Sequence, residues 1–302
     1  MLTKFTALVM GVLLSVSAMA ADMATADMAT LTRQAQSGGA VAQSDLADEY
    51  YQQGNHAKAF EWYTKAANQG KAEAQHNLGV MYYEGQGVRQ DYYKSVEWYT
   101  KAAKQGYADA QFNLALMYAQ GDGVRQDYHK AFEWFTKAAN QGLAEAQFSL
   151  GVMYDEGQGV RQDYYKAVEW YTKAANQGYA GAQFNLALMY YEGQGVRQDD
   201  QEAVEWYTKA AGQGHAEAQY NLGVMYYEGQ GVRQDYHKAV EWFTKAANQG
   251  FAQAQNNLGV MYDEGQGVRQ NIATAKIYYG QACDHGLQKG CDNYRLLHQQ
   301  GH

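Results

Sequence analysis

Five asparagines recur at a regular spacing along this sequence. They are 36 or 72 residues apart, and Ser149 fills the one gap in the series. The five are Asn77, Asn113, Asn185, Asn221 and Asn257. An asparagine side chain carries both a donor and an acceptor, so a ladder of them can bind successive backbone amides of an extended peptide. We therefore expect a peptide-binding role. The alternative is an asparagine that bonds only within its own helix pair.

A row of carboxylates follows the asparagines seven residues further along. Its members are Glu84, Glu156, Glu192 and Glu228, with Glu264 at the end and Gln120 beside them. Such a row favours a peptide that is basic or neutral. The neighbouring position varies between repeats and reads Tyr83, Ala119, Asp155, Tyr191, Tyr227 and Asp263. Variation at a fixed position of near-identical units indicates a surface position.

The sequence holds no group of residues typical of an enzyme or a metal site. The Ser-x-x-Lys motif of serine β-lactamases is absent. The residues three places after Ser37, Ser44, Ser95 and Ser149 are Ala40, Ala47, Trp98 and Val152. Glycine pairs such as Gly85 and Gly87 are not directly followed by Lys-Ser/Thr, and no H-E-x-x-H occurs. We predict no catalysis, no cofactor and no metal.

Cys283 and Cys291 are the only two cysteines. They stand where the preceding repeat has Ala247 and Gln255, at the end of one expected helix and the start of the next. Helix ends joined by a short turn are neighbours, so a disulfide is expected if the two Cα atoms come within roughly 4.4 to 6.8 Å. Two free thiols are the alternative.

A strict internal period defines the elements that must position these side chains. The six tryptophans occupy positions 62, 98, 134, 170, 206 and 242, at intervals of 36 residues. Glycines recur with the same period from Gly70 to Gly286 and from Gly85 to Gly265. A fixed period between about 20 and 50 residues is typical of a solenoid, in which each unit buries its apolar face against its neighbours.

Each repeat contains two helical patterns. In the second repeat, apolar residues recur at helical spacing from 74 to 82 and again from 92 to 103. Gly85 is expected to end the first helix, and Asp91 to cap the start of the second. The tryptophans fall on the second helical stripe, which predicts that they are buried in the core.

The repeat reads A-x-x-x-L-G-x-M-Y-x-x-G-x-G-V-x-x-D-x-x-K-A-x-x-W-x-x-K-A-A-x-Q-G. This pattern resembles the Sel-like repeat of the Sel-one family, a relative of the tetratricopeptide repeat with a longer, glycine-rich loop. Six units, from Lys71 to Gly286, match it. The first unit departs from it, because four loop residues are missing between Leu46 and Asn55. The last has Tyr278 at the tryptophan position.

The resemblance implies an all-α fold, a right-handed α-solenoid of tandem 36-residue helix-loop-helix repeats whose first helices line a concave groove. It implies a non-catalytic scaffold for protein or peptide partners, located in the bacterial periplasm or secreted. The C-x7-C of the last unit is similar to the cysteine-rich secreted branch of the family. Some members of that branch carry β-lactamase or penicillin-binding labels, which gives an enzymatic alternative. A structural spacer without any ligand is a third reading.

The ends of the chain complete the expected organisation. Residues 1–20 combine Lys4, a mostly apolar run and a small-x-small end, which predicts a signal peptide, with a membrane anchor as the alternative. Four further segments follow. We expect a disordered leader at 21–30, an N-terminal cap with a short-loop first repeat at 31–70, six repeats at 71–286, and a C-terminal capping helix and tail at 287–302.

Composition restricts the class of partner. The formal net charge is −8, and a basic footprint typical of nucleic-acid binding is missing. No long apolar segment follows the first 20 residues, so we expect no transmembrane segment after signal removal. A protein or peptide partner is the remaining expectation.

Overall fold

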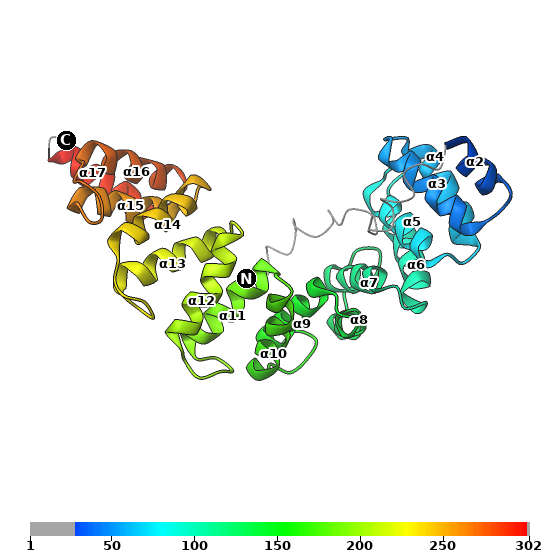
Figure 1. Cartoon of the computed structure of the whole chain (residues 1–302), viewed down its shortest axis with the longest axis horizontal. Coiled ribbons are helices and arrows are strands. Elements are labelled where there is room, and N and C mark those ends of the chain that lie inside the picture. The colour runs from blue at the N-terminus through cyan, green and yellow to red at the C-terminus, as the bar shows by residue number, and fades with distance from the viewer. Residues whose placement is uncertain (1–27, 301–302) are drawn as a thin grey trace. The chain divides into compact units, whose positions relative to one another are not determined.

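The computed structural model describes residues 28–300, so the expected signal peptide at 1–20 lies outside the described residues. The described range contains sixteen α-helices and no strand (Figure 1). The helices are α2 (Met28–Gln36), α3 (Ala40–Gln52), α4 (His56–Asn68), α5 (Ala72–Glu84), α6 (Tyr92–Lys104), α7 (Ala108–Gln120), α8 (Tyr128–Asn140), α9 (Ala144–Glu156), α10 (Tyr164–Asn176), α11 (Ala180–Glu192), α12 (Asp200–Gly212), α13 (Ala216–Glu228), α14 (Tyr236–Asn248), α15 (Ala252–Glu264), α16 (Ile272–Asp284) and α17 (Gln288–Gln299). The predicted all-α fold is confirmed.

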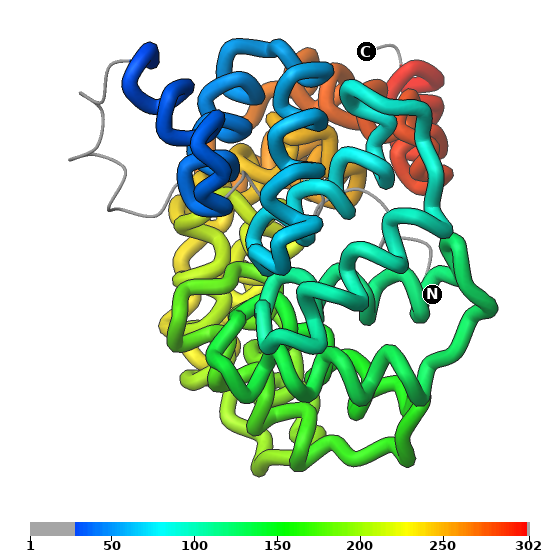
Figure 2. The backbone as a smooth tube through the Cα atoms, turned by 90° about the vertical axis from the view of Figure 1, so that its right-hand side faces the viewer, coloured from blue at the N-terminus to red at the C-terminus, as the bar shows by residue number. Residues whose placement is uncertain are grey.

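Helices of two kinds alternate along the chain. We name α3, α5, α7, α9, α11, α13 and α15 the A helices, and the helices that follow each of them the B helices. Their contacts define two units, unit 1 up to Gln141 and unit 2 from Gly142. In each unit an A helix packs against its B helix, which packs against the next A helix. Figure 2 shows successive helices joined by short loops, and this alternating packing is that of an α-solenoid.

Glycine and aspartate set the helix boundaries. The A helices from α5 to α15 each end at a glycine in the left-handed conformation, such as Gly85 with φ 75°. Glycine adopts this conformation without a steric penalty. The B helices from α6 to α14 each start after a capping aspartate, and the Asp91 carboxylate accepts a 3.1 Å bond from the Lys94 N–H. The boundaries predicted at Gly85 and Asp91 are therefore confirmed.

The tryptophans do not occupy the centre of the core. Each is half-buried, whereas the aromatic residue after it is almost fully buried. Trp134 covers the edge of a cluster that contains Tyr99 of the preceding repeat and Met117 of its own repeat. Its outer face carries the Lys137 ammonium, 3.9 Å from the ring centroid. The prediction of core tryptophans was wrong, because Phe135 and its equivalents face the A helices instead.

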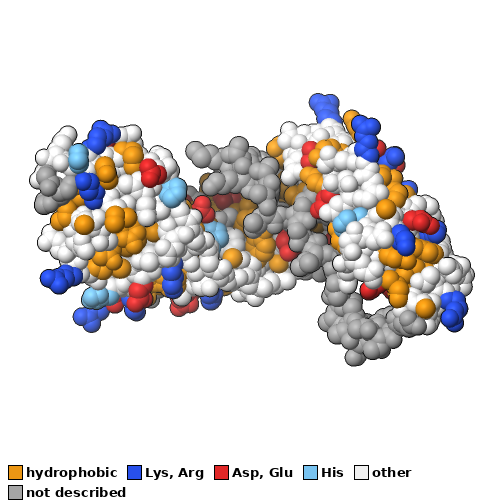
Figure 3. All heavy atoms as spheres, turned by 90° about the horizontal axis from the view of Figure 1, so that it is seen from above, with side chains coloured by type: hydrophobic (Ala, Val, Ile, Leu, Met, Phe, Trp, Pro, Cys, Tyr) orange, Lys and Arg blue, Asp and Glu red, His pale blue; other side chains and the backbone are white. Residues whose placement is uncertain are grey.

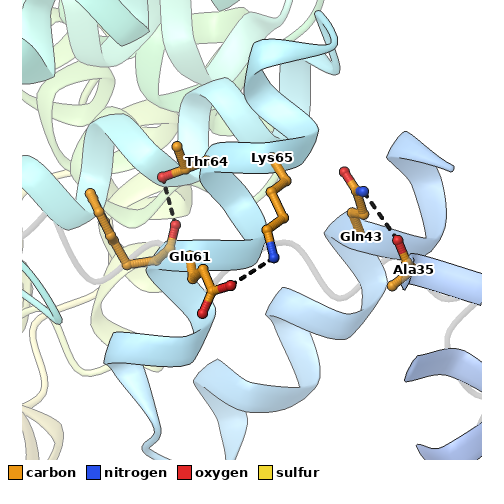
Figure 4. A network of polar contacts seen from close by, with 6 residues as sticks. Ala35, Gln43, Glu61, Thr64 and Lys65 are labelled. Carbon is orange, nitrogen blue, oxygen red and sulfur yellow. Dashed lines mark hydrogen bonds and ion pairs between the residues drawn. The ribbon is translucent and has the colours of Figure 1, made fainter. Parts of the chain in front are cut away.

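Buried glutamines link each repeat to the next. The Gln75 side chain donates to the Ala67 carbonyl at the end of α4 at 3.0 Å, and accepts from Gln105 at 2.7 Å. Gln43 makes the same bond to the Ala35 carbonyl at 3.1 Å (Figure 4). The buried members are Gln43, Gln75, Gln111, Gln147, Gln183, Gln219 and Gln255. These bonds satisfy carbonyl groups that a helix end leaves without a partner.

The described N-terminal end is helical. Helix α2 begins at Met28, so residues 28–30 of the expected disordered leader are helical, and the rest of that segment lies outside the described residues. Ala35 of α2 is buried. No helix in the range 28–300 is long and apolar enough to cross a membrane.

A disulfide fixes the C-terminal helix. It joins Cys283 near the end of α16 to Cys291 in α17, with the Cα atoms 4.5 Å apart, which confirms the predicted bond. The neighbouring Gly290 allows the two helices to approach closely, because a Cβ atom there would lie 2.6 Å from the Ala282 Cβ. Leu297 of α17 is buried against this end of the chain.

Candidate peptide-binding face

The predicted asparagines all lie at the sixth position of an A helix, so they share one register of the A-helix layer. Asn77 and Asn113 in unit 1 are buried, with exposed fractions of 4% and 7%. Asn185, Asn221 and Asn257 in unit 2 are half-buried. In unit 2 these amides therefore reach the surface of the layer.

The asparagine side chains bond to the preceding repeat. Nδ2 of Asn221 donates to the Tyr207 hydroxyl oxygen at 3.1 Å, and Nδ2 of Asn113 lies 3.0 Å from Nε2 of His76. Tyr207 belongs to α12, whereas Asn221 belongs to the following pair, α13 and α14. Burial raises the pKa of Tyr207, and the bond from Asn221 acts in the opposite direction. The carbonyl oxygen of Asn221 takes no part in this bond and can accept from a peptide N–H.

The predicted glutamates are the last residues of their A helices. Glu84 in unit 1 is half-buried, whereas Glu156, Glu192 and Glu228 in unit 2 are exposed. Residues seven apart lie on the same side of a helix, so each glutamate stands on the same side as the asparagine of its helix. The structure thus places these residues on one face of unit 2, while their role in binding stays a prediction.

A second row of side chains lies beside these glutamates. It consists of Asp155, Tyr191, Tyr227 and Asp263, which are half-buried on four successive A helices. The Tyr171 hydroxyl donates to Oδ2 of Asp155 at 3.2 Å. Burial raises the pKa of Asp155, the bond from Tyr171 lowers it, and the charges of Glu156 and Glu192 raise it. Variation between repeats marked this position as a surface, but gave no indication of these partners.

Aromatic pairs that the sequence reasoning missed lie toward the other end of the A helices. Phe184 of α11 stacks on His215, which precedes α13, with centroids 4.7 Å apart and planes 19° apart. Tyr220 and Phe251 form the next pair at 5.1 Å. Each pair joins one A helix to the start of the next. The signal in the sequence was an aromatic residue recurring 36 residues apart from Phe148 to Tyr220.

The basic residues of a repeat lie elsewhere, the arginine in the loop that precedes the B helix and the lysines on the B helix itself. A pocket of ≈ 750 Å³ at the start of α10 is lined by Arg161, Asp163 and Lys166, and an equivalent pocket of ≈ 580 Å³ lies at the start of α14. Lys166 pairs with Asp163 at 3.9 Å. The next loop closes the pocket tightly, since a Cβ atom on Gly195 would lie 2.3 Å from the Tyr164 carbonyl oxygen. Arg161 and Lys166 therefore line a pocket at the start of the B helix.

Comparison with known proteins places this architecture in a family. The Sel1 repeat matches seven consecutive segments, at residues 40–71, 72–107, 108–143, 144–179, 180–215, 216–251 and 252–287. No curated protein matches the chain.

Two solved structures are similar over most of the chain. The first is a protective antigen of uropathogenic Escherichia coli strains that displays an SLR fold, with 38% identity, a TM-score of 0.88 and 91% of this chain covered. This chain spans 60% of the length of that antigen. The second is a Sel1 repeat protein from Oxalobacter formigenes, with 36% identity, a TM-score of 0.75, and coverage of 89% of this chain and 79% of that one. The chain therefore belongs to the Sel1 repeat family.

Proposed function

We propose that this chain is a non-catalytic, exported scaffold that binds an extended protein segment along its A-helix layer. Sel1 repeat proteins are generally protein-interaction scaffolds. One observation carries the proposal for this chain. Asn185, Asn221 and Asn257 are half-buried at one register of unit 2, on the same side of their helices as the terminal glutamates.

In this proposal each repeat adds one modest contact. Packed helices lie roughly 8 to 10 Å apart, and an extended chain advances about 3.3 Å per residue. An extended segment that crosses the layer therefore meets a new A helix about every three residues. At each helix the asparagine carbonyl oxygen accepts a backbone N–H, and neighbouring aromatic side chains cover the bond. Affinity then arises from several repeats acting together.

The disulfide supports the exported part of the proposal. Disulfides persist in oxidising compartments such as the periplasm and the extracellular medium. The bond between Cys283 and Cys291 fits such a compartment. We therefore place the mature scaffold in the periplasm or outside the cell.

An enzymatic role lacks an observation in its favour. The sequence contains no Ser-x-x-Lys, and the pocket at the start of α10 is lined by a paired lysine and aspartate rather than by a nucleophile and its base. We therefore propose binding without catalysis. Hydrolysis of nitrocefin by the purified chain would contradict this part.

The test uses an array of random-sequence peptides probed with the full chain. The variant replaces Asn185 and Asn221 by serine, because Ser149 already occupies this register and is compatible with the fold. A matched control carries Glu205→Gln and Glu241→Gln on the B helices. We expect the asparagine variant to lose most array signals and the control to keep them. Array binding that is the same for all three proteins would contradict the proposal.

A further inference from the structure

Charge is segregated between the two helix layers of unit 2. The A helices α9, α11, α13 and α15 contain no lysine and no arginine. They carry eight carboxylates, from Glu145, Asp155, Glu156, Glu192, Glu217, Glu228, Asp263 and Glu264. The repeats place their lysines on B helices and their arginines in loops. Figure 3 shows one face of the molecule, with basic side chains in blue and acidic side chains in red. The A-helix layer is therefore the acidic face of unit 2.

Four of these carboxylates stand where they reduce helix stability. The last residues of the four A helices are Glu156, Glu192, Glu228 and Glu264. A helix C-terminus carries partial negative charge, which favours a cation and disfavours a carboxylate. The B helices follow this preference, with Lys173 in the last turn of α10 and Lys245 in that of α14. The A helices have no basic residue there. An unfavourable carboxylate at the same C-terminal position of four helices is typical of a position kept for function rather than for stability.

Within residues 142–300, no lysine or arginine forms an ion pair with this face. Glu217 lies 3.9 Å from His215, and this pair is charged only when His215 is protonated. Burial lowers the pKa of His215, although Glu217 raises it, so the histidine is mostly neutral at pH 7. The negative charge of the A-helix layer is therefore left for a partner to neutralise.

The carboxylates are densest at the two ends of this face, because α9 and α15 each end in an aspartate and a glutamate, whereas α11 and α13 each end in a tyrosine and a glutamate. Tyr191 and Tyr227 take the register that an aspartate takes on α9 and α15. The first acidic group is Asp155, Glu156 and Glu192, and the second is Glu228, Asp263 and Glu264. The Tyr191 hydroxyl donates to Oε1 of Gln230 at 3.2 Å, which orients its ring. Tyrosine rings accept guanidinium groups and the aliphatic stems of long basic side chains.

We infer that the partner of this face is a basic protein segment with two groups of lysine or arginine. The inference rests on the proposed function and specifies the chemistry of its ligand. Each basic group pairs with one acidic group, and the residues between them lie over Tyr191 and Tyr227. The centres of the acidic groups are two A helices apart, on the order of 20 Å. An extended chain spans this distance in about six residues, so the basic groups are separated by about six residues.

The experiment measures binding of fluorescent synthetic peptides to the full chain by anisotropy. The probe carries two Lys-Arg pairs separated by about six neutral residues. One control peptide has glutamate at the basic positions, and another has all four basic residues at one end. The test variant is Glu192→Gln with Glu228→Gln. The control variant, Glu205→Gln with Glu241→Gln, changes net charge equally on the B helices.

We expect the probe to bind the parent and the control variant alike, and the test variant roughly tenfold more weakly. The test variant should melt no lower than the parent, because its lost charges opposed the helix dipoles. Equal binding by both variants would overturn the inference. Equally tight binding of the peptide with clustered charge would overturn the two-group arrangement.

The random-sequence array separates this inference from the proposed function. Peptides that bind the A-helix layer and show an excess of lysine and arginine support both. Peptides that bind there without such an excess leave the scaffold role in place and overturn the basic ligand. An array without any bound peptide overturns both.

Discussion

Gly151 of α9 lies directly against the ring of Tyr171 of α10, so that a Cβ atom on Gly151 would stand 2.4 Å from Cδ1 of the tyrosine. Tyr171 is fully buried, and its ring cannot move outward without leaving the core. Two other repeats have Ala115 or Ala187 at this position, and there the next residue is leucine instead of valine. The contact between an A helix and its B helix is therefore packed in two ways, with glycine and valine in some repeats and alanine and leucine in others.

Gly151→Ala is expected to lower the free energy of unfolding by about 1 kcal/mol. Overpacking a core costs ~1 to 3 kcal/mol, and the better helix propensity of alanine returns ~1 kcal/mol. The double variant Gly151→Ala with Val152→Leu copies the pairing at 187–188 and should recover most of the loss. Urea unfolding of the three proteins gives the comparison. A single variant more stable than the parent would contradict the packing described for Tyr171.

Alanine substitutions at Phe135 and Trp134 should destabilise the fold to different extents, because the first residue lies in the core and the second at its edge. Phe135→Ala is expected to cost ~3 to 5 kcal/mol, because Phe135 is 2% exposed. Trp134→Ala should cost less, roughly 2 kcal/mol, because the half-buried ring loses a smaller buried area and one contact with Lys137. Chemical unfolding of both variants measures the two losses in free energy of unfolding. A larger loss for Trp134→Ala than for Phe135→Ala would show that the tryptophan is a core residue.

Asp48 makes the stability of unit 1 depend on pH. Burial raises the pKa of Asp48 to about 7, although the hydrogen bond from Tyr63 lowers it. The folded chain therefore holds this proton more tightly than the unfolded chain, and the contribution of Asp48 to stability falls as pH rises from about 4 to about 7. Asp48→Asn keeps an acceptor for Tyr63 and removes the charge.

The Asp48→Asn variant should unfold at the same urea concentration as the parent at a pH of about 3, where the aspartate is protonated in both states. At a pH of about 8 the variant should be more stable by on the order of 1 to 2 kcal/mol, since one pKa unit corresponds to ~1.4 kcal/mol and solvent screens part of the effect. A difference of the same size at both pH values would show that the charge is not its cause.

Loss of the disulfide should act locally. Cys283→Ser with Cys291→Ser is expected to destabilise the C-terminal end by ~2 to 3 kcal/mol. Amides of α17 should then exchange hydrogen faster, because a repeat array transmits stability only between neighbours. Hydrogen exchange measured by mass spectrometry resolves α17 from α3. Equal acceleration in both helices would contradict a local role for the bond.

Two glutamate substitutions should shift stability in opposite directions. Glu228→Gln is expected to raise the free energy of unfolding by ~0.3 to 1 kcal/mol, because it removes a negative charge from the C-terminus of α13. Glu169→Gln should lower it by ~0.2 to 0.5 kcal/mol, because Glu169 pairs with Lys173 at 2.7 Å one turn along α10. Thermal unfolding of both variants at low salt shows whether each substitution raises or lowers the free energy of unfolding. A destabilising Glu228→Gln would mean that the glutamate has a structural partner.

The helix boundaries were predictable because Gly85, Asp91 and their equivalents set them chemically, at every 36 residues. Burial was less predictable. Helical spacing does not decide which of two adjacent aromatic residues, Trp134 or Phe135, faces the neighbouring helix, since both fall within one broad stripe.

The side-chain contacts between repeats could not be predicted from the sequence. Glutamine is usually exposed, so Gln75 gives no sign of the bond to the Ala67 carbonyl that it makes when buried. The spacing of Asn221 and Glu228 placed them on one side of a helix. The partner of Asn221, Tyr207, depends on how α12 lies against α13, which only the structure gives.

The most direct test of the central claim is site-specific photocrosslinking to a bound peptide. A photoreactive phenylalanine derivative replaces Tyr227 on the A-helix layer in one protein, and Tyr165, 78% exposed on a B helix, in another. The basic two-group peptide should crosslink at position 227 and not at 165. Crosslinks at position 165, with none at 227, would contradict binding along the A-helix layer.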